Sequence, residues 1–157
     1  MNTVLLAFGP KDEQRIDELL DTATSIVDPD GTIVLLHAFD RKQYDSISTK
    51  LNIDDNAEVT PDDVARRARV VRDIADRLDR AGVDYVVRGA IGETSDAILR
   101  QSEADDTDLV VVGGRSRSAT GKALFGSTAQ KVLVEADCPV TFVKEQSETK
   151  KKAAAPA

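Results

Sequence analysis

The residues with the clearest chemical potential lie in one segment of the carboxyl-terminal third. An apolar run, Val110–Val112, ends in a glycine pair, and a long polar connection leads to Gly126-Ser127-Thr128, where a helix is expected to begin. A strand, a loop and a helix N-terminus in this order offer backbone N–H groups and a positive helix dipole to an anion. Long loops inside compact domains are uncommon and are often functional. The pattern predicts a ligand that carries phosphate.

The spacing within this segment separates it from the common phosphate-binding loops. No Gly-Lys-Ser/Thr follows a four-residue spacer, so it is not a Walker-type loop, and it lacks the alternating glycines of a dinucleotide site. Its spacing is Gly113, two residues, Ser116, nine residues, then Gly126-Ser127. The connection also carries three cations, Arg115, Arg117 and Lys122. The alternative is a glycine-rich connection that only clears the helix, but the loop's length and its cations count against it.

The spacing resembles the nucleotide-binding loop of the universal stress protein family, which runs Gly, two residues, Gly, nine residues, Gly-Ser/Thr. Asp108–Gly113 resembles the fourth strand of that family and Cys138–Val143 its closing strand. The resemblance covers residues 3–144. It implies that Gly113, Ser116 and Gly126-Ser127 hold phosphates and that the backbone of Ala38 meets adenine.

Two positions depart from the family pattern. ATP-binding members usually carry an aspartate just after the first strand, where this chain has Gly9, and the lost polar contact is worth about 1–3 kcal/mol. Ser116 replaces a glycine; it keeps the backbone N–H but disfavours positive φ. The predicted nucleotide-binding residues are Gly9, Ala38, Gly113, Arg115, Ser116, Lys122, Gly126, Ser127 and Thr128.

Apolar runs alternating with helical periodicity predict an α/β fold with parallel strands. The expected strands are 4–8, 32–37, 83–88, 109–112 and 140–143. The resemblance implies an open five-stranded sheet of order 3-2-1-4-5 with helices on both faces, a Rossmann-like fold. Ligands bind such sheets where the strand order reverses. Residues 8–10 and 113–127 should therefore face each other across one crevice.

The segments between these strands differ in how clearly they predict helices. Thr60-Pro61 marks a helix start, and apolar residues at helical spacing extend the helix to Ala81. Residues 39–59 are polar and only weakly periodic, with scattered Asp and Asn, which predicts a mobile excursion. The helix at 60–81 should bury Val64, Ala68, Val71, Ala75 and Leu78, and the last helix Ala129, Val132, Leu133 and Ala136.

The charges of the helix at 60–81 suggest a solvated face and not a nucleic-acid stripe. Its arginines are interleaved with aspartates that can pair with them four residues apart. The expected pairs are Asp62–Arg66, Asp63–Arg67, Arg69–Asp73 and Arg72–Asp76.

Composition bounds the class of protein. The 157 residues predict one domain at 1–145, and 146–157 read as a disordered tail. A net charge of −7 argues against a duplex nucleic-acid partner. No apolar run is long enough to span a bilayer, and no signal peptide is recognisable, so we expect a cytoplasmic protein without a membrane partner. The acidic surface would suit a salt-rich cytoplasm.

No catalytic or metal-binding constellation is visible. The lone cysteine, Cys138, reads as a buried inert thiol. His37 reads as a packed, hydrogen-bonded strand residue and not as a base.

These observations favour a universal stress protein-like regulator that binds ATP or a related adenine nucleotide, with Mg²⁺ as a possible companion and at most slow hydrolysis. The alternatives are a nucleotide-free dimerising scaffold and, less favoured, an adenine nucleotide α-hydrolase-like enzyme. The last strand, 140–143, predicts a homodimer because an apolar edge strand needs a partner.

Overall fold

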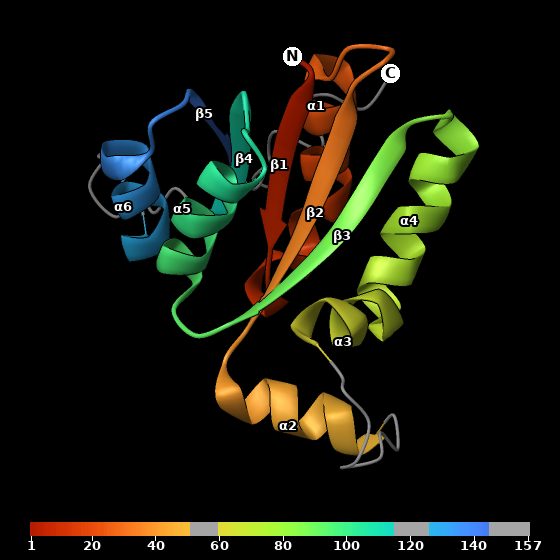
Figure 1. Ribbon diagram of the computed structural model, residues 1–157, viewed down its shortest axis with the longest axis vertical. Helices are drawn as coiled ribbons and strands as arrows, with labels where there is room; N and C mark the ends of the chain where they lie inside the picture. The colour runs from red at the N-terminus through yellow and green to blue at the C-terminus, as the bar shows by residue number, and fades with distance from the viewer. Residues whose placement is uncertain (51–59, 115–125, 145–157) are drawn as a thin grey trace, which may run out of the picture.

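A computed structural model describes residues 1–50, 60–114 and 126–144. The chain forms one five-stranded parallel sheet of order β3-β2-β1-β4-β5, which confirms the predicted fold (Figure 1). The strands are β1 (Thr3–Phe8), β2 (Thr32–Phe39), β3 (Asp84–Ile91), β4 (Leu109–Gly114) and β5 (Val140–Lys144). The strand order reverses between β1 and β4, so a crevice is expected beyond their carboxyl ends.

Helices cover both faces of the sheet. The helical segments are η1 (Pro10–Arg15), α1 (Ile16–Ile26), α2 (Arg41–Lys50), α3 (Pro61–Arg67), α4 (Arg69–Ala81), α5 (Thr94–Ala104) and α6 (Ser127–Glu135). Side chains of α1, α3 and α4 pack on one face, and side chains of α5 and α6 pack on the other. In Figure 1, α2 lies beyond the carboxyl ends of the strands and not over either face.

Successive side chains of the central strand β1 point to opposite faces of the sheet and belong to two separate hydrophobic clusters. Val4, Leu6 and Phe8 belong to the cluster under α1, α3 and α4, whereas Leu5 and Ala7 belong to the cluster under α5 and α6. All five side chains are at most 4% exposed. A strand buried on both faces reads as a continuous apolar run, which is why the sequence located β1 and β2 so directly.

The helix predicted over 60–81 is interrupted. Thr60 caps α3 through its hydroxyl oxygen, which accepts the N–H of Asp63, but Ala68 adopts ψ 136° and a new helix begins at Arg69. Of the residues expected to be buried on this segment, Ala75 is only half-buried, whereas Ile74, which was not expected in the core, is buried. The bend rotates the apolar stripe of α4 relative to that of α3.

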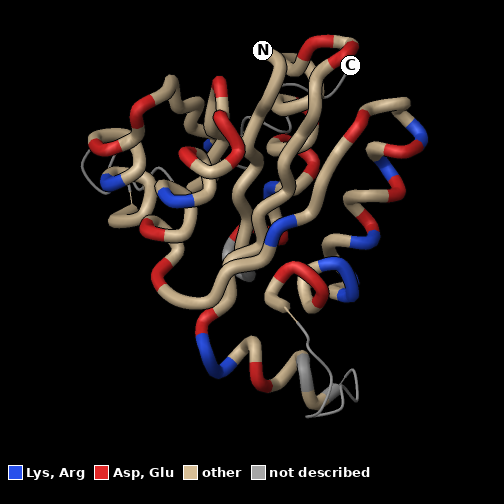
Figure 2. Tube along the Cα trace, in the orientation of Figure 1, with Lys and Arg blue, Asp and Glu red and all other residues tan. Residues whose placement is uncertain are grey.

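The ion pairs of this region also differ from the predicted i,i+4 set. Among the described residues, Arg66 pairs with Asp63 three residues away, and Arg77 pairs with Asp17 of α1. Asp62 accepts the backbone N–H of Gly89 at 2.7 Å instead of meeting Arg66. Figure 2 shows acidic and basic residues interspersed along α4, as expected for a solvated face.

Two further expectations were wrong. Residues 41–50 form the helix α2, although residues 39–59 were expected to be a mobile excursion; residues 51–59 lie outside the described part of the chain. Leu133 of α6 was expected in the core but is 38% exposed, while Ala129 and Val132 are buried. The predicted tail, 146–157, also lies outside the described residues. No helix in the described ranges is long and apolar enough to cross a membrane.

Candidate functional site

The polar groups of the turn after β1, residues 9–15, form hydrogen bonds with one another. Asp12 accepts the backbone N–H of Gly9 through Oδ2 at 2.9 Å, and its Oδ1 accepts the Nε–H of Arg15 at 2.5 Å. The Arg15 side chain is 7% exposed and that of Asp12 14%. A buried guanidinium with a carboxylate partner therefore lies at the carboxyl end of β1.

The end of β4 lies directly against this pair. A Cβ placed on Gly113 would be 2.8 Å from both Cδ and Nε of Arg15 and 3.2 Å from Oδ1 of Asp12. A side chain at position 113 would therefore force the buried Arg15 side chain to shift, and glycine permits the close approach without that shift. The fold thus brings Gly113, the first residue of the predicted phosphate segment, to the β1 turn.

The N-terminus of α6 supplies hydrogen-bond donors. Gly126 is the N-cap and has no side chain with which to cap the first turn, and both Gly126 and Ser127 are exposed. A Cβ on Gly126 would meet no atom of the described residues within 4 Å. The first N–H groups of a helix need external acceptors, and the helix dipole adds positive potential there. In Figure 1, α6 begins at the end of the sheet where the strands finish. This end of α6 can bind an anion.

Ala38 lies beside the β1 turn. The pairing of β1 with β2 ends at Phe8 and His37, so Ala38 is one residue beyond it, paired only with Ala90 of β3. The carbonyl oxygen of Ala38 would be 4.0 Å from a Cβ on Gly9. The structure therefore places Gly9 and Ala38 together at the carboxyl edge of the sheet.

The remaining predicted site residues divide between described and undescribed parts of the chain. Thr128 is half-buried in the first turn of α6. Arg115, Ser116 and Lys122 lie outside the described residues, so their contribution stays a prediction.

His37 is packed, as expected, but one of its ring nitrogens lacks the expected hydrogen bond. The residue is 6% exposed, and its buried Nδ1 has no hydrogen-bond partner in the part of the chain that the structure describes. The ring stacks on Phe8 with centroids 5.0 Å apart and meets Phe39 edge-on at 4.2 Å. Burial lowers the pKa of His37 to about 4, so the imidazole is neutral near pH 7.

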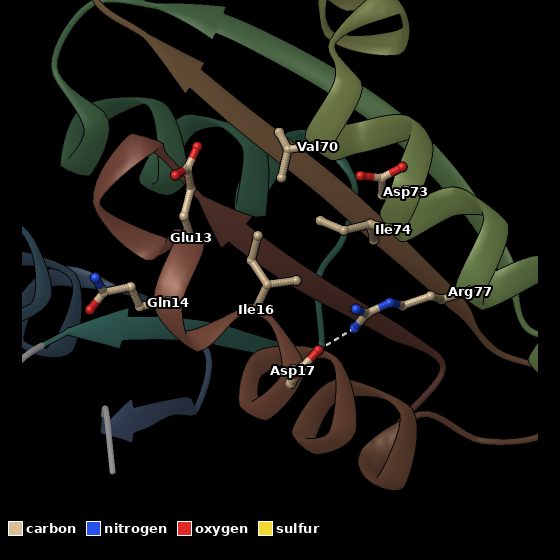
Figure 3. A pocket seen from close by; sticks show the side chains of 8 residues that line it. All are labelled: Glu13, Gln14, Ile16, Asp17, Val70, Asp73, Ile74 and Arg77. Atoms are coloured by element: carbon tan, nitrogen blue, oxygen red, sulfur yellow. Dashed lines mark hydrogen bonds and ion pairs between the residues drawn. The ribbon is translucent and has the colours of Figure 1, made fainter. Parts of the chain in front are cut away.

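Two other features are structural. Cys138 is half-buried, less than expected, and burial raises the pKa of its thiol, which favours the unreactive protonated form. A shallow cavity of about 210 Å³ lies between the start of α1 and α4, and Figure 3 shows the Asp17–Arg77 ion pair across it. Within the described ranges, no group of acidic, histidine or cysteine side chains could hold a metal ion.

Asp12 and Arg15 were not predicted from the sequence. Their i,i+3 spacing after Gly9-Pro10 was a usable signal, because that spacing suits a capping carboxylate and a partner on the same face of a turn. Nothing in the sequence showed that Arg15 would reach Gly113, because the two residues meet only through the sheet.

The fold defines an α/β protein of the doubly wound parallel class. The sequence model of the universal stress protein family matches residues 1–144, and the chain belongs to that family. A universal stress protein of Mycolicibacterium smegmatis is 35% identical over 79 residues, which are 50% of this chain and 61% of the relative. The alignment therefore spans less than two thirds of that relative.

Solved structures share the fold at low identity. A universal stress protein in complex with cAMP superposes with a TM-score of 0.62 at 20% identity, covering 92% of this chain and 98% of that one. A universal stress protein family protein from Arabidopsis thaliana with AMP bound gives a TM-score of 0.61 at 18% identity, covering 94% of each chain.

Proposed function

We propose that this protein is a cytoplasmic universal stress regulator that binds ATP or a related adenine nucleotide in the crevice between β1 and β4, with at most slow hydrolysis. The observation that carries the proposal is the exposed N-terminus of α6, whose N-cap glycine provides no side-chain cap of its own, at the same edge as Gly113 and the buried Arg15. Donors and positive charge at one edge of the sheet are what a phosphate requires.

The proposal assigns separate residues to the phosphates and to the base of the nucleotide. Backbone N–H groups of Gly113, Ser116 and Gly126–Thr128 would hold the phosphates, with Arg115 or Lys122 neutralising charge. The backbone of Ala38, next to Gly9, would contact the base. Arg15 would add positive potential beneath the phosphates. The AMP and cAMP complexes of two structural neighbours support adenine as the base.

Thermal unfolding with and without nucleotide tests the proposal. At a nucleotide concentration 100 times Kd, linkage stabilises the folded chain by about 2.7 kcal/mol and raises the Tm. ATP and AMP should each raise the Tm, whereas adenosine should do so less because it lacks phosphate. Mass spectrometry of the denatured, freshly purified protein should also release an adenine nucleotide. No shift at millimolar ATP, AMP or cAMP, with or without Mg²⁺, would overturn the proposal.

A nucleotide-free dimeric scaffold is the second candidate, because the Asp12–Arg15 pair already satisfies polar groups that a ligand could otherwise meet. Both candidates include a homodimer through β5, in which β5 pairs with its twofold mate. β5 is the edge strand beside β4, and Val140 and Phe142 pack toward α6, so backbone groups would make the pairing.

A cysteine at the expected axis tests the dimer. In a Cys138→Ser background, Thr141→Cys should form an intermolecular disulfide under mild oxidation, because residues that face each other across paired strands lie within disulfide range. Arg100→Cys on α5 is the control and should stay monomeric on a non-reducing gel. Equal cross-linking of both variants, or a monomer by light scattering at tens of micromolar, would contradict dimerisation through β5.

A further inference from the structure

The outer edge of β3 lies in contact with the first turn of α3. In the described part of the chain β3 is an edge strand, because only β2 pairs with it. A Cβ on Gly89 would be 2.1 Å from the carbonyl oxygen of Pro61 and 3.1 Å from Cβ of Ala65. A side chain at position 89 would therefore push the start of α3 away from the strand. Figure 1 shows α3 beside the carboxyl-terminal part of β3.

Two charged side chains bond to backbone groups on this edge. Oδ1 of Asp62 accepts the N–H of Gly89 at 2.7 Å, and the carbonyl oxygen of Val87 accepts a hydrogen bond from Nη1 of Arg88 at 3.4 Å. The guanidinium of Arg88 also lies 3.6 Å from Oδ1 of Asp105, the C-cap of α5. One side chain from α3 and one from β3 itself thus meet neighbouring groups of the edge.

These two backbone groups are the ones that an added parallel strand would use. In a parallel ladder, one residue of the new strand donates to a carbonyl and accepts from the N–H two residues further along. On β3 these groups are the carbonyl of Val87 and the N–H of Gly89. Unpaired strand edges are templates for pairing with another chain, and proteins protect them with charged side chains or with a covering helix. The β3 edge has both kinds of protection.

We propose that Asp62 of α3 and Arg88 together block strand addition at β3. The block restricts sheet-to-sheet association to the β5 edge. Association through one edge about a twofold axis closes at two copies, whereas association through both edges continues into a fibre. The blocking role depends neither on nucleotide binding nor on pairing of β5.

Removal of both blocking side chains from the full chain tests the proposal. Asp62→Ala combined with Arg88→Ala should form species larger than the wild-type assembly, seen by sedimentation velocity at roughly 10–300 μM protein. Asp62→Asn keeps an oxygen acceptor for the N–H of Gly89 and should sediment as wild type does. The matched control is Asp63→Ala, which removes the contacts of α3 with Thr60 and Arg66 but leaves the Gly89 contact in place. This control should also sediment as wild type does.

A distance measurement identifies the edge that pairs. Val86 on β3 is 37% exposed, so a nitroxide can be attached to Val86→Cys in a Cys138→Ser background, which removes the only native cysteine. Copies joined at β3 bring the two labels within about 20 Å. Copies joined at β5 separate them by about 40 Å, because the strands of both sheets, about 4.8 Å apart, then lie between them. The larger species of the double variant should show the short distance by double electron–electron resonance.

Three results would overturn the proposal. They are a double variant that assembles no further than wild type, an Asp63→Ala protein that assembles as the double variant does, and larger species without the short distance. If the double variant does not fold by circular dichroism, amide exchange of Gly89 decides. That N–H should exchange roughly tenfold faster in Asp62→Ala than in wild type or Asp62→Asn, and equal rates in all three overturn the block.

Discussion

The two walls of the crevice between β1 and β4 are built in opposite ways. On the β1 wall, polar groups satisfy one another: Asp12 holds the N–H of Gly9 and the guanidinium of Arg15, both within the turn. On the α6 wall, Gly126 and Ser127 are exposed, and the N-cap residue is a glycine, which provides no side-chain cap of its own. We call the β1 wall closed, because its polar groups bond to one another, and the α6 wall open, because its first N–H groups are exposed.

This difference assigns distinct roles to the walls. A closed wall contributes shape and a fixed charge, and altering it should mainly change the free energy of unfolding. An open wall contributes unfilled donors, and altering it should mainly change ligand affinity. The lost family aspartate at Gly9 fits this division, because Asp12 now occupies the backbone N–H of that position.

Breaking the closed wall should have the largest effect on stability. Arg15→Met leaves the Asp12 carboxylate without its guanidinium, and breaking a buried pair costs about 3 kcal/mol or more. Urea denaturation measures the change. Asp63→Ala, which removes the exposed pair with Arg66, is the matched control, although it also removes the contacts of Asp63 with Thr60. It should cost clearly less than Arg15→Met, because the pair is exposed. Equal losses in the two variants would contradict the buried character of the first pair.

The buried imidazole of His37, which stacks on Phe8, should make the free energy of unfolding depend on pH. Burial lowers the pKa of His37 to about 4, whereas an unfolded histidine titrates near 6.5. The unfolded chain binds the extra proton between these values, so stability is full above about pH 6.5 and is lost as the pH falls toward 4, by about 3 kcal/mol. His37→Leu should lose this one-proton slope in denaturation at pH 4–7. Identical slopes in both chains would contradict the buried neutral imidazole.

The same substitution on the two walls should separate stability from binding. Gly113→Val forces a side chain to within 3 Å of Arg15, and such overpacking costs about 1–3 kcal/mol. A Cβ on Gly126 meets no described atom within 4 Å, so Gly126→Val should lower the urea midpoint less than Gly113→Val does, by no more than the weaker N-cap preference of valine. Should Gly126→Val destabilise the apo protein as much as Gly113→Val does, the distinction between the walls is wrong.

An aspartate at position 9, where ATP-binding family members carry one, should have a smaller effect, and that effect should be on ATP affinity. Among the described residues, a Cβ at Gly9 would meet only the carbonyl oxygen of Ala38, at 4.0 Å, so the backbone there has room for the Cβ of Gly9→Asp. We expect ATP to bind about 3–10 times more tightly, equivalent to roughly 1 kcal/mol. Calorimetric titration measures this change, with Gly9→Asn as the uncharged control. Weaker binding by Gly9→Asp would show that the introduced carboxylate and Asp12 repel each other or that the ribose lies elsewhere.

The sequence predicted the sheet because β1, β2 and β4 are buried on both faces and read as apolar runs. It predicted α6 from Gly126-Ser127 but placed Leu133 in the core, since periodicity alone does not fix how far a stripe extends around a helix. It missed α2, whose residues have little apolar periodicity, and the break at Ala68, where local propensity favours helix and tertiary packing decides otherwise.

The candidate site was predictable where a motif lies within one segment, as at Gly113 and Gly126-Ser127. It was not predictable where segments distant in sequence meet. Arg15 against Gly113 and His37 between Phe8 and Phe39 are products of strand order and register. Such contacts come from the tertiary arrangement and not from any local pattern.

Calorimetric titration of ATP into wild type, Gly126→Val and Glu135→Val tests the central claim most directly. The two substitutions lie at opposite ends of α6, and only the first alters the open wall. We expect saturable binding by wild type and Glu135→Val, and at least tenfold weaker binding by Gly126→Val with an unchanged apo fold, because a side chain at the helix N-terminus blocks close approach of phosphate. Equal affinity in all three proteins, or no binding by any, would contradict the claim.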